Sequence, residues 1–208
     1  MAKKSLKKEH REDIVLPHFK TLTDDEFSQL CKDVQGHITP PELCRDRNGA
    51  PVFLSFPAYW LVKSEPDVYP IEQLKKDGST GWTGVRNYQA RNLMRDSMKV
   101  GDGVLFYHSN ADPKAVVGVA SVIKTGIPDP TQFDPKSEYF DPKSKPENPT
   151  WIMVEIGYVK TLLRPVTLER LKDRPGLENM MLTRRGSRLS VQPVTQDEAE
   201  IVLDMGRG

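Results

Sequence analysis

Residues 82–92 (WTGVRNYQARN) bring an aromatic ring, a glycine, an amide and two arginines into eleven consecutive positions. Trp82 offers a flat face for stacking, and Gly84 lets the backbone approach a ligand closely because it has no Cβ. Asn87 can cap a helix that follows, or donate and accept hydrogen bonds beside the edge of a base. We therefore predict that this stretch lines a binding pocket.

Other candidate residues stand at the ends of predicted strands. Ser64 follows the apolar run at 59–62, and Tyr107, His108 and Ser109 end the run at 104–109. Side chains alternate between the two faces of a strand, so Tyr107 and His108 point to opposite faces unless a bulge intervenes. A lone histidine on an apolar face is more often structural than functional.

The elements that position these residues follow from hydrophobic spacing. Ala90, Leu93, Met94 and Met98 keep helical spacing, which predicts a helix from Tyr88 with the pocket at its N-terminus, where free N–H groups favour electron-rich ligands. Further strands are predicted at 115–123, 151–160 and 188–193, and short helices at 70–78, after Thr167 and after the capping box of Thr195 and Glu198. Short strands with peripheral helices predict a small α+β barrel.

The segment 125–150 contains six prolines. Proline removes a backbone donor, so we predict neither a helix nor a central strand there. Long loops in compact domains are uncommon unless they have a function, which makes the wall of a binding groove and a passive surface loop equal alternatives.

Residues 1–58 differ in composition from the rest. Their first eleven positions form a basic tail, which we interpret as disordered, and a capping-box pattern at Thr23 predicts a helix at 24–35. One strand is expected at 52–56. We therefore divide the chain into an N-terminal extension, 1–58, and a folded domain, 59–205.

Charge and cysteine content limit the classes of function. Lys+Arg of 30 against Asp+Glu of 29 excludes a bulk polycation, so a nucleic-acid partner must be held by a local patch. Two such patches are candidates, at 81–99 and at 183–192. Cys31 and Cys44 have no neighbours at metal-ligand spacing, so no metal is expected. No apolar run is long enough to span a bilayer, and we expect an intracellular monomer, cytoplasmic in a bacterium or nuclear in a eukaryote.

Five segments together resemble the EVE domain family of the PUA-like superfamily. They are 59–66 (YWLVKSEP), 84–92 (GVRNYQARN), 106–110 (FYHSN), 129–133 (DPTQF) and 188–193 (RLSVQP). The resemblance covers 59–205 and not the N-terminal extension. It departs from the family pattern at Thr83, where an acidic residue is usual.

The resemblance implies a β-barrel of five or six strands flanked by short helices, and a pocket that binds a flipped modified base in DNA or RNA. Bases of the 5-methylcytosine and 5-hydroxymethylcytosine class are implied, with no enzymatic activity and no cofactor. The candidate pocket residues are Ser64, Trp82, Gly84, Val85, Asn87, Tyr88, Tyr107, His108, Ser109 and Ser190. The candidate phosphate-binding residues are Lys63, Arg86, Arg91 and Arg188.

Two other functions remain open. PUA-like barrels include amidohydrolases that act on acylated cytidine, and Lys63 and Glu65 share one face of a strand, where they could activate a nucleophile and transfer a proton. No nucleophile elbow and no Cys/His pair supports this alternative. The other alternative is a protein-interaction module that docks a partner on the proline-rich segment.

Overall fold

The structure is a computed structural model that describes residues 44–45, 51–52 and 56–207. The predicted basic tail and the helix at 24–35 lie outside the described residues. So does most of the strand predicted at 52–56. Within the extension, β1 (Cys44–Arg45) pairs antiparallel with β2 (Pro51–Val52).

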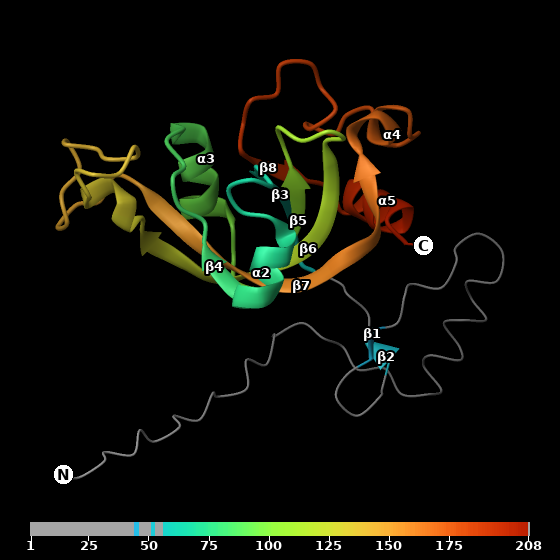
Figure 1. Ribbon diagram of the computed structural model, residues 1–208, viewed down its shortest axis with the longest axis horizontal. Helices are drawn as coiled ribbons and strands as arrows, with labels where there is room; N and C mark the ends of the chain where they lie inside the picture. Colours follow the sequence, from blue (N-terminus) through green and yellow to red (C-terminus); the bar gives the residue numbers. More distant parts are fainter. Residues whose placement is uncertain (1–43, 46–50, 53–55, 208) are drawn as a thin grey trace, which may run out of the picture.

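Six strands form the main sheet, in the order β4-β7-β6-β5-β3-β8. Their bounds are β3 (Tyr59–Ser64), β4 (Ser79–Gly81), β5 (Gly103–His108), β6 (Ala115–Pro128), β7 (Ile152–Thr167) and β8 (Val191–Val194). Only the β3–β5 pair is parallel among these strands, and the others are antiparallel. The two long strands, β6 and β7, curve strongly, so the sheet wraps around its own core (Figure 1).

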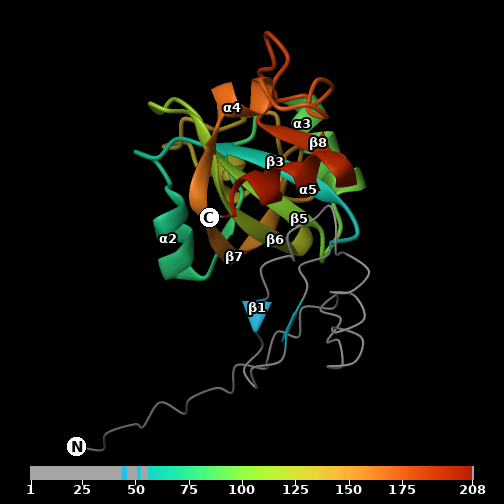
Figure 2. The same cartoon turned by 90° about the vertical axis from the view of Figure 1, so that its right-hand side faces the viewer.

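Short helices flank the sheet. They are α2 (Ile71–Asp77), α3 (Tyr88–Asn92), α4 (Leu168–Lys172) and α5 (Gln196–Met205), with one π-helical turn at Leu93–Ser97 and one 3-10 turn at Pro130–Phe133. The predicted capping box of α5 is confirmed, because Thr195 and Glu198 each accept from the other's backbone N–H. Figure 2 shows α5 in front of the strands, near the centre of the view, and α2 at the left edge of the domain.

Strand alternation divides the core into two clusters. Leu105 and Tyr107 of β5 pack on one side with α5, whereas Val104 and Phe106 pack on the other side with Trp82. The second cluster therefore supports the segment that was predicted to form the pocket, and it holds that segment against the sheet.

The predicted α+β fold with five or six strands is confirmed, but several strand ends differ. β6 continues through residues 125–128, and β7 continues to Thr167 although it contains Pro165. The β6–β7 register jumps between the pairs Gly118–Thr161 and Val116–Val166, so Pro165 lies where no regular ladder needs its missing N–H. The last strand is shorter than predicted and begins at Val191.

Candidate functional site

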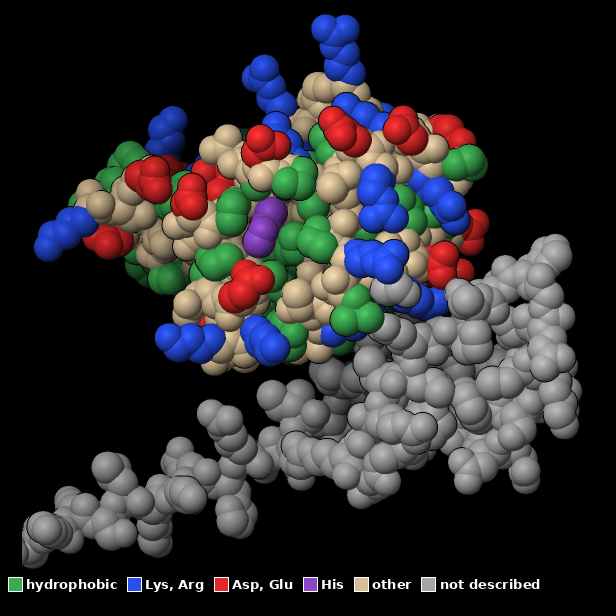
Figure 3. All heavy atoms as spheres, turned by 45° about the vertical axis from the view of Figure 1, so that its right-hand side comes forward, with side chains coloured by type: hydrophobic (Ala, Val, Ile, Leu, Met, Phe, Trp, Pro, Cys, Tyr) green, Lys and Arg blue, Asp and Glu red, His purple; other side chains and the backbone are tan. Residues whose placement is uncertain are grey.

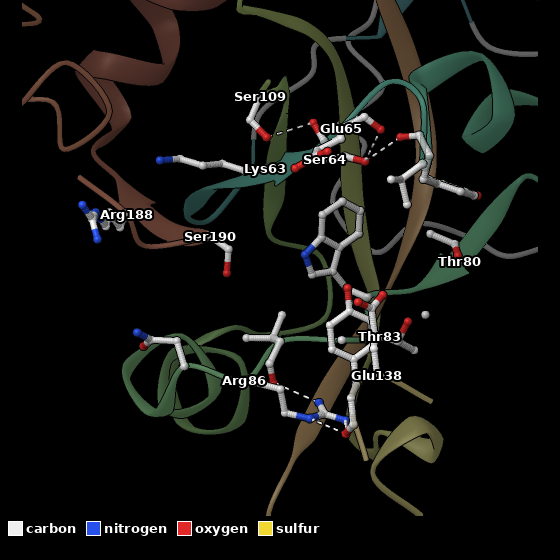
Figure 4. Close-up of a pocket in the computed structure, with 18 residues that line it drawn as sticks. Lys63, Ser64, Glu65, Thr80, Thr83, Arg86, Ser109, Glu138, Arg188 and Ser190 are labelled. Carbon is white, nitrogen blue, oxygen red and sulfur yellow. Dashed lines mark hydrogen bonds between the residues drawn. The ribbon is translucent and has the colours of Figure 1, made fainter. Parts of the chain in front are cut away.

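A cavity of about 750 Å³ opens between the ends of several elements. Its walls come from the end of β3, the segment from β4 to α3, the proline-rich segment and the residues before β8 (Figure 4). The lining residues are Lys63, Ser64, Glu65, Val68, Tyr69, Thr80, Gly81, Trp82, Thr83, Gly84, Val85, Arg86, Asn87, Ser109, Glu138, Tyr139, Arg188 and Ser190. Parts of the chain far apart in sequence thus meet in one pocket of the size that small ligands occupy.

Trp82 belongs both to the core and to the pocket wall. Its ring meets Phe106 edge to face, with centroids 5.6 Å apart, and 8% of its surface is exposed. It is therefore a firmly packed back wall of the cavity and not a freely standing platform.

Tyr139 is the more open aromatic surface in the pocket. It is 37% exposed and comes from the proline-rich loop, as we call residues 129–150. Gly84 has a φ of +78°, and a Cβ built there would lie 2.9 Å from the Tyr139 ring. Glycine is therefore needed here because the Tyr139 ring packs against the backbone of Gly84. The sequence had predicted that a ligand would approach the backbone at this place.

An acid on the proline-rich loop takes the N–H of Gly84. The carboxylate of Asp129 accepts from that N–H at 2.9 Å, from the N–H of Thr131 at 2.9 Å and from its hydroxyl at 2.7 Å. Burial alone raises the pKa of Asp129, but these bonds and the one from Arg86 together hold the pKa below its ordinary value. The Gly84 N–H is therefore not available to the edge of a base.

Arg86 fastens the proline-rich loop to the pocket. Its Nε donates to the Tyr139 carbonyl at 2.7 Å, and the terminal nitrogens donate to that carbonyl again, to the Val85 carbonyl at 3.1 Å, to Asp129 at 2.8 Å and to the Thr131 hydroxyl at 2.8 Å. A guanidinium has five N–H donors, and all are used. This arrangement argues against the predicted phosphate contact.

Arg91 and Tyr88, unlike Arg86, do not line the pocket. The Arg91 guanidinium donates to the Thr150 carbonyl at 2.9 Å and to Asn92, and it lies 4.9 Å from the centre of the Tyr88 ring. Tyr88 in turn packs on Trp151, with centroids 4.8 Å apart. These contacts hold α3 to the far end of the proline-rich loop, and they argue against the predicted base contact of Tyr88 and the predicted phosphate contact of Arg91.

The proline-rich loop is ordered around the buried side chain of Gln132. Its amide nitrogen donates to the carbonyls of Asp129 and Trp151, both at 2.8 Å, and its oxygen accepts from the N–H of Trp151 at 2.9 Å and from the Ser144 hydroxyl. Of the two alternatives for this segment, the structure favours a pocket wall, because Glu138 and Tyr139 line the cavity.

Small polar groups surround the cavity, and some of them are already paired. The Ser64 hydroxyl donates to the Tyr69 carbonyl at 2.6 Å, and the Ser109 hydroxyl donates to the Ser64 carbonyl at 3.2 Å. Both hydroxyls can still accept. The Asn87 oxygen caps α3 by accepting from the N–H groups of Gln89 and Ala90, and no group of the described residues takes a hydrogen bond from its NH₂ group, which can donate.

The two remaining cations differ in their surroundings. Lys63 donates to the Ser187 carbonyl at 3.0 Å, and burial is the main reason that its pKa is lowered. Arg188 is exposed at the rim and, within the described residues, its guanidinium has no hydrogen bond or ion pair. In Figure 4 the Lys63 ammonium extends toward the side where Arg188 lies.

Tyr107 and His108 do not line the cavity. Tyr107 is buried in the core cluster beside α5, and burial raises its pKa to about 12. His108 Nε2 accepts from the N–H of Ile71 at 3.2 Å, and burial lowers the pKa of the ring. A bulge does exist here, but its extra residue is Val117 of β6, so β5 keeps its alternation. The placement of these two side chains in the pocket is therefore wrong.

Sequence reasoning missed several lining residues. Val68, Tyr69 and Thr80 belong to no motif, and Glu138 and Tyr139 lie in a segment that the sequence analysis considered only for its prolines.

No group of acids, histidines and cysteines in the described part of the chain could hold a metal ion. Across residues 56–207 and the two short strands before them, no helix has the length and apolar character to cross a membrane.

Comparison with known proteins gives one consistent result. The model of the EVE domain matches residues 58–205. Thymocyte nuclear protein 1 of Gallus gallus is 42% identical over 166 residues, which are 71% of this chain and 68% of that protein. The protein of the same name from Homo sapiens is 40% identical over 167 residues, 71% and 73% of the two chains.

Solved structures agree with the family match. A protein from Pseudomonas syringae has a TM-score of 0.69 and 43% identity, covering 72% of this chain and 99% of that one. Human THYN1 in complex with DNA that contains 5-methylcytosine has a TM-score of 0.67 and 40% identity, covering 73% and 98%. The predicted family and its fold are confirmed.

Proposed function

This chain belongs to the EVE domain family, and we propose that it binds DNA carrying a modified cytosine by holding the extruded base in the cavity beside Trp82 and Tyr139. The observation that carries the proposal is the pairing of two aromatic side chains with small polar groups in one open cavity. The DNA-bound relative, at 40% identity, supports the choice of ligand. The word nuclear in the name of the curated relatives fits such a ligand.

Aromatic contact offsets the cost of removing the base from its stack. Extrusion costs a few kcal/mol, and stacking on a protein ring returns about 1 to 3 kcal/mol per base. Trp82 gives a rigid edge at the back, and Tyr139 gives an exposed ring at the front. Because the Tyr139 carbonyl is held by Arg86, that ring is positioned before the ligand arrives.

Polar groups around the cavity match the edge of a cytosine. The exocyclic amino group of cytosine donates, and the carboxylates of Glu138 and Glu65 at the rim can accept from it. The NH₂ group of Asn87 and the Ser190 hydroxyl can donate to the acceptors N3 and O2. A 5-methyl group would contact an apolar wall such as Val85, and one methyl in an apolar pocket changes the binding free energy by about 1 to 3 kcal/mol.

Replacing Tyr139 by alanine tests the pocket and keeps the main-chain hydrogen bonds between Arg86 and the loop. The variant removes the ring but keeps the main-chain carbonyl that Arg86 binds. We expect Tyr139→Ala to weaken binding of a duplex with one 5-methylcytosine by about 5- to 150-fold, since about 1 to 3 kcal/mol of stacking is lost. Fluorescence anisotropy on modified and unmodified duplexes measures the change.

Phe140→Ala is the matched control. Phe140 is the next residue, is 39% exposed against 37% for Tyr139, and does not line the cavity. The Phe140→Ala variant should bind both duplexes with the affinities of the parent. If Tyr139→Ala and Phe140→Ala have the same effect, the cavity is not where the base binds.

An amidohydrolase acting on acylated cytidine is the second candidate. Lys63 and Glu65 both line the cavity, and burial lowers the pKa of Lys63, which favours a neutral amine. Incubation with N4-acetylcytidine followed by mass spectrometry tests it. Deacetylated product that disappears in Lys63→Ala would support the enzyme and count against a pure reader.

A further inference from the structure

A second hollow adjoins the main cavity. It has a volume of about 400 Å³ and lies between the start of α3 and residues 183–190, which we call the basic loop. Asn87 and Arg188 line both hollows. The two are therefore neighbours that share a wall, and a ligand in one can extend into the other.

The charge of this second hollow has one sign. Its charged lining residues are Arg184, Arg185 and Arg188, and no acid lines it. All three arginines are exposed, and within residues 56–207 none of their side chains has a hydrogen bond or an ion pair. They differ in this from Arg86 and Arg91, whose guanidinium groups are held by the protein itself.

The basic loop is held in place although its arginine side chains pair with no residue that the structure describes. Lys63 binds the Ser187 carbonyl at 3.0 Å, and the buried amide of Gln192 donates to the Ser187 hydroxyl at 2.9 Å and to the Leu189 carbonyl at 2.8 Å. Gly186 turns the chain with a φ of +80°. Free cations on an anchored loop suit an anionic ligand, because little loop order is lost on binding.

We propose that this hollow binds the phosphodiester backbone of the strand whose modified base enters the main cavity. The inference rests on the proposed function and names Arg184 and Arg185 as its principal phosphate contacts, in place of Arg86 and Arg91. A base in the main cavity stays linked to its own phosphates, which must leave through the mouth. Arg188 stands at that mouth and leads into the second hollow.

The double variant Arg184→Ala/Arg185→Ala, made in the full chain, tests the inference. Affinities for a modified and an unmodified duplex are measured at 50, 100 and 200 mM salt. Loss of two phosphate contacts should reduce the magnitude of the slope of log K against log salt by about 1.4 to 1.8. The affinities for the two duplexes should fall by the same factor. The preference for the modified duplex should stay as in the parent, because phosphate contacts do not read the base.

Two further variants define what the result means. Lys75→Ala/Lys76→Ala removes the same charge from exposed neighbours in the last turn of α2, on the opposite side of the domain in Figure 1, and should leave the slope unchanged. Arg184→Lys/Arg185→Lys keeps the charge and should keep most of the slope.

The possible outcomes either support or overturn the phosphate site. An unchanged slope in Arg184→Ala/Arg185→Ala, or an equal fall in the lysine control, overturns the inference. Competition by polyglutamate as effective as that by an unmodified duplex would assign the hollow to an acidic protein and also overturn it. A reduced slope with no preference for the modified duplex in the parent supports the phosphate site while the proposed base recognition fails.

Discussion

Replacing Arg86 by alanine is expected to loosen the proline-rich loop and to destabilise the domain. The guanidinium makes every hydrogen bond it can make, and each one joins the segment before α3 to that loop or to its own backbone. No other side chain of the pocket makes as many contacts with the loop.

The magnitude follows from the burial of the ion pair. Arg86 lies 2.8 Å from Asp129, and the two side chains are 20% and 3% exposed. Removing one partner of a buried pair costs about 3 to 5 kcal/mol, because a charge is left without compensation. Asp129 keeps its bonds from Gly84 and Thr131, so we expect the lower limit, about 3 kcal/mol.

Urea unfolding measures the loss, and Arg95→Ala is the control. Arg95 and Asp96 form an ion pair of nearly the same length, 2.7 Å, but their side chains are 45% and 53% exposed. Exposed pairs contribute little, so Arg95→Ala should keep the parental midpoint. With an m-value of about 2 kcal/mol/M, Arg86→Ala should lower the midpoint by about 1.5 M. Trypsin should also cut its loop faster, at Lys136 or Lys143.

The loss should depend on pH. The pKa of Asp129 lies below its ordinary value, so its contribution to stability is complete above about pH 4 and is lost as the pH falls through the folded-state pKa. The difference between parent and Arg86→Ala should therefore be largest near neutral pH and shrink in acid. Equal midpoints and equal trypsin cleavage for Arg86→Ala and Arg95→Ala at pH 7 would refute the reasoning.

Three more substitutions separate packing from recognition. Gly84→Ala should lower the free energy of unfolding by at least roughly 1 kcal/mol, as expected of any positive-φ glycine. Because the new Cβ would meet the Tyr139 ring, Gly84→Ala should also weaken binding of the modified duplex. Gly126→Ala, at a φ of +70° and with open space around it, should lose stability but keep its binding. Trp82→Ala should cost about 3 to 5 kcal/mol in unfolding experiments, since its ring packs on Phe106; a variant as stable as the parent would show that the ring is not part of the core.

Local patterns in the sequence predicted much of the fold. The capping box of Thr195 and Glu198 and the alternation of Val104 and Phe106 against Leu105 and Tyr107 depend on residues only a few positions apart. Such patterns can be recognised without knowing the partner. The lengths of β6 and β7 could not be predicted in this way, because the bulges that admit Pro165 exist only in the pairing of the two strands.

The candidate site was predicted less evenly. Trp82, Gly84, Val85 and Asn87 do line the cavity, and so do Ser64, Ser109 and Ser190. Asn87 is also the helix cap, which was the other role considered for it. The pocket residues of the segment 82–92 could be recognised because a simple turn does not need an aromatic ring, an amide and two arginines together.

The roles of the arginines depend on partners far away in the sequence. Arg86 and Arg188 look equally free in a sequence, yet Asp129 binds the first at 2.8 Å while no described residue pairs with the second. Charge runs show where cations are, and only the fold shows which of them are already neutralised. The same holds for Trp82, because its contact with Phe106, which makes it part of the core, comes from a residue distant in the sequence.

A crystal structure of this chain with a duplex containing one 5-methylcytosine tests the central claim most directly. The account predicts density for the modified base outside the duplex stack, in the cavity between Trp82 and Tyr139. A bound duplex with that base still stacked and paired, and the cavity filled only by water, would contradict it.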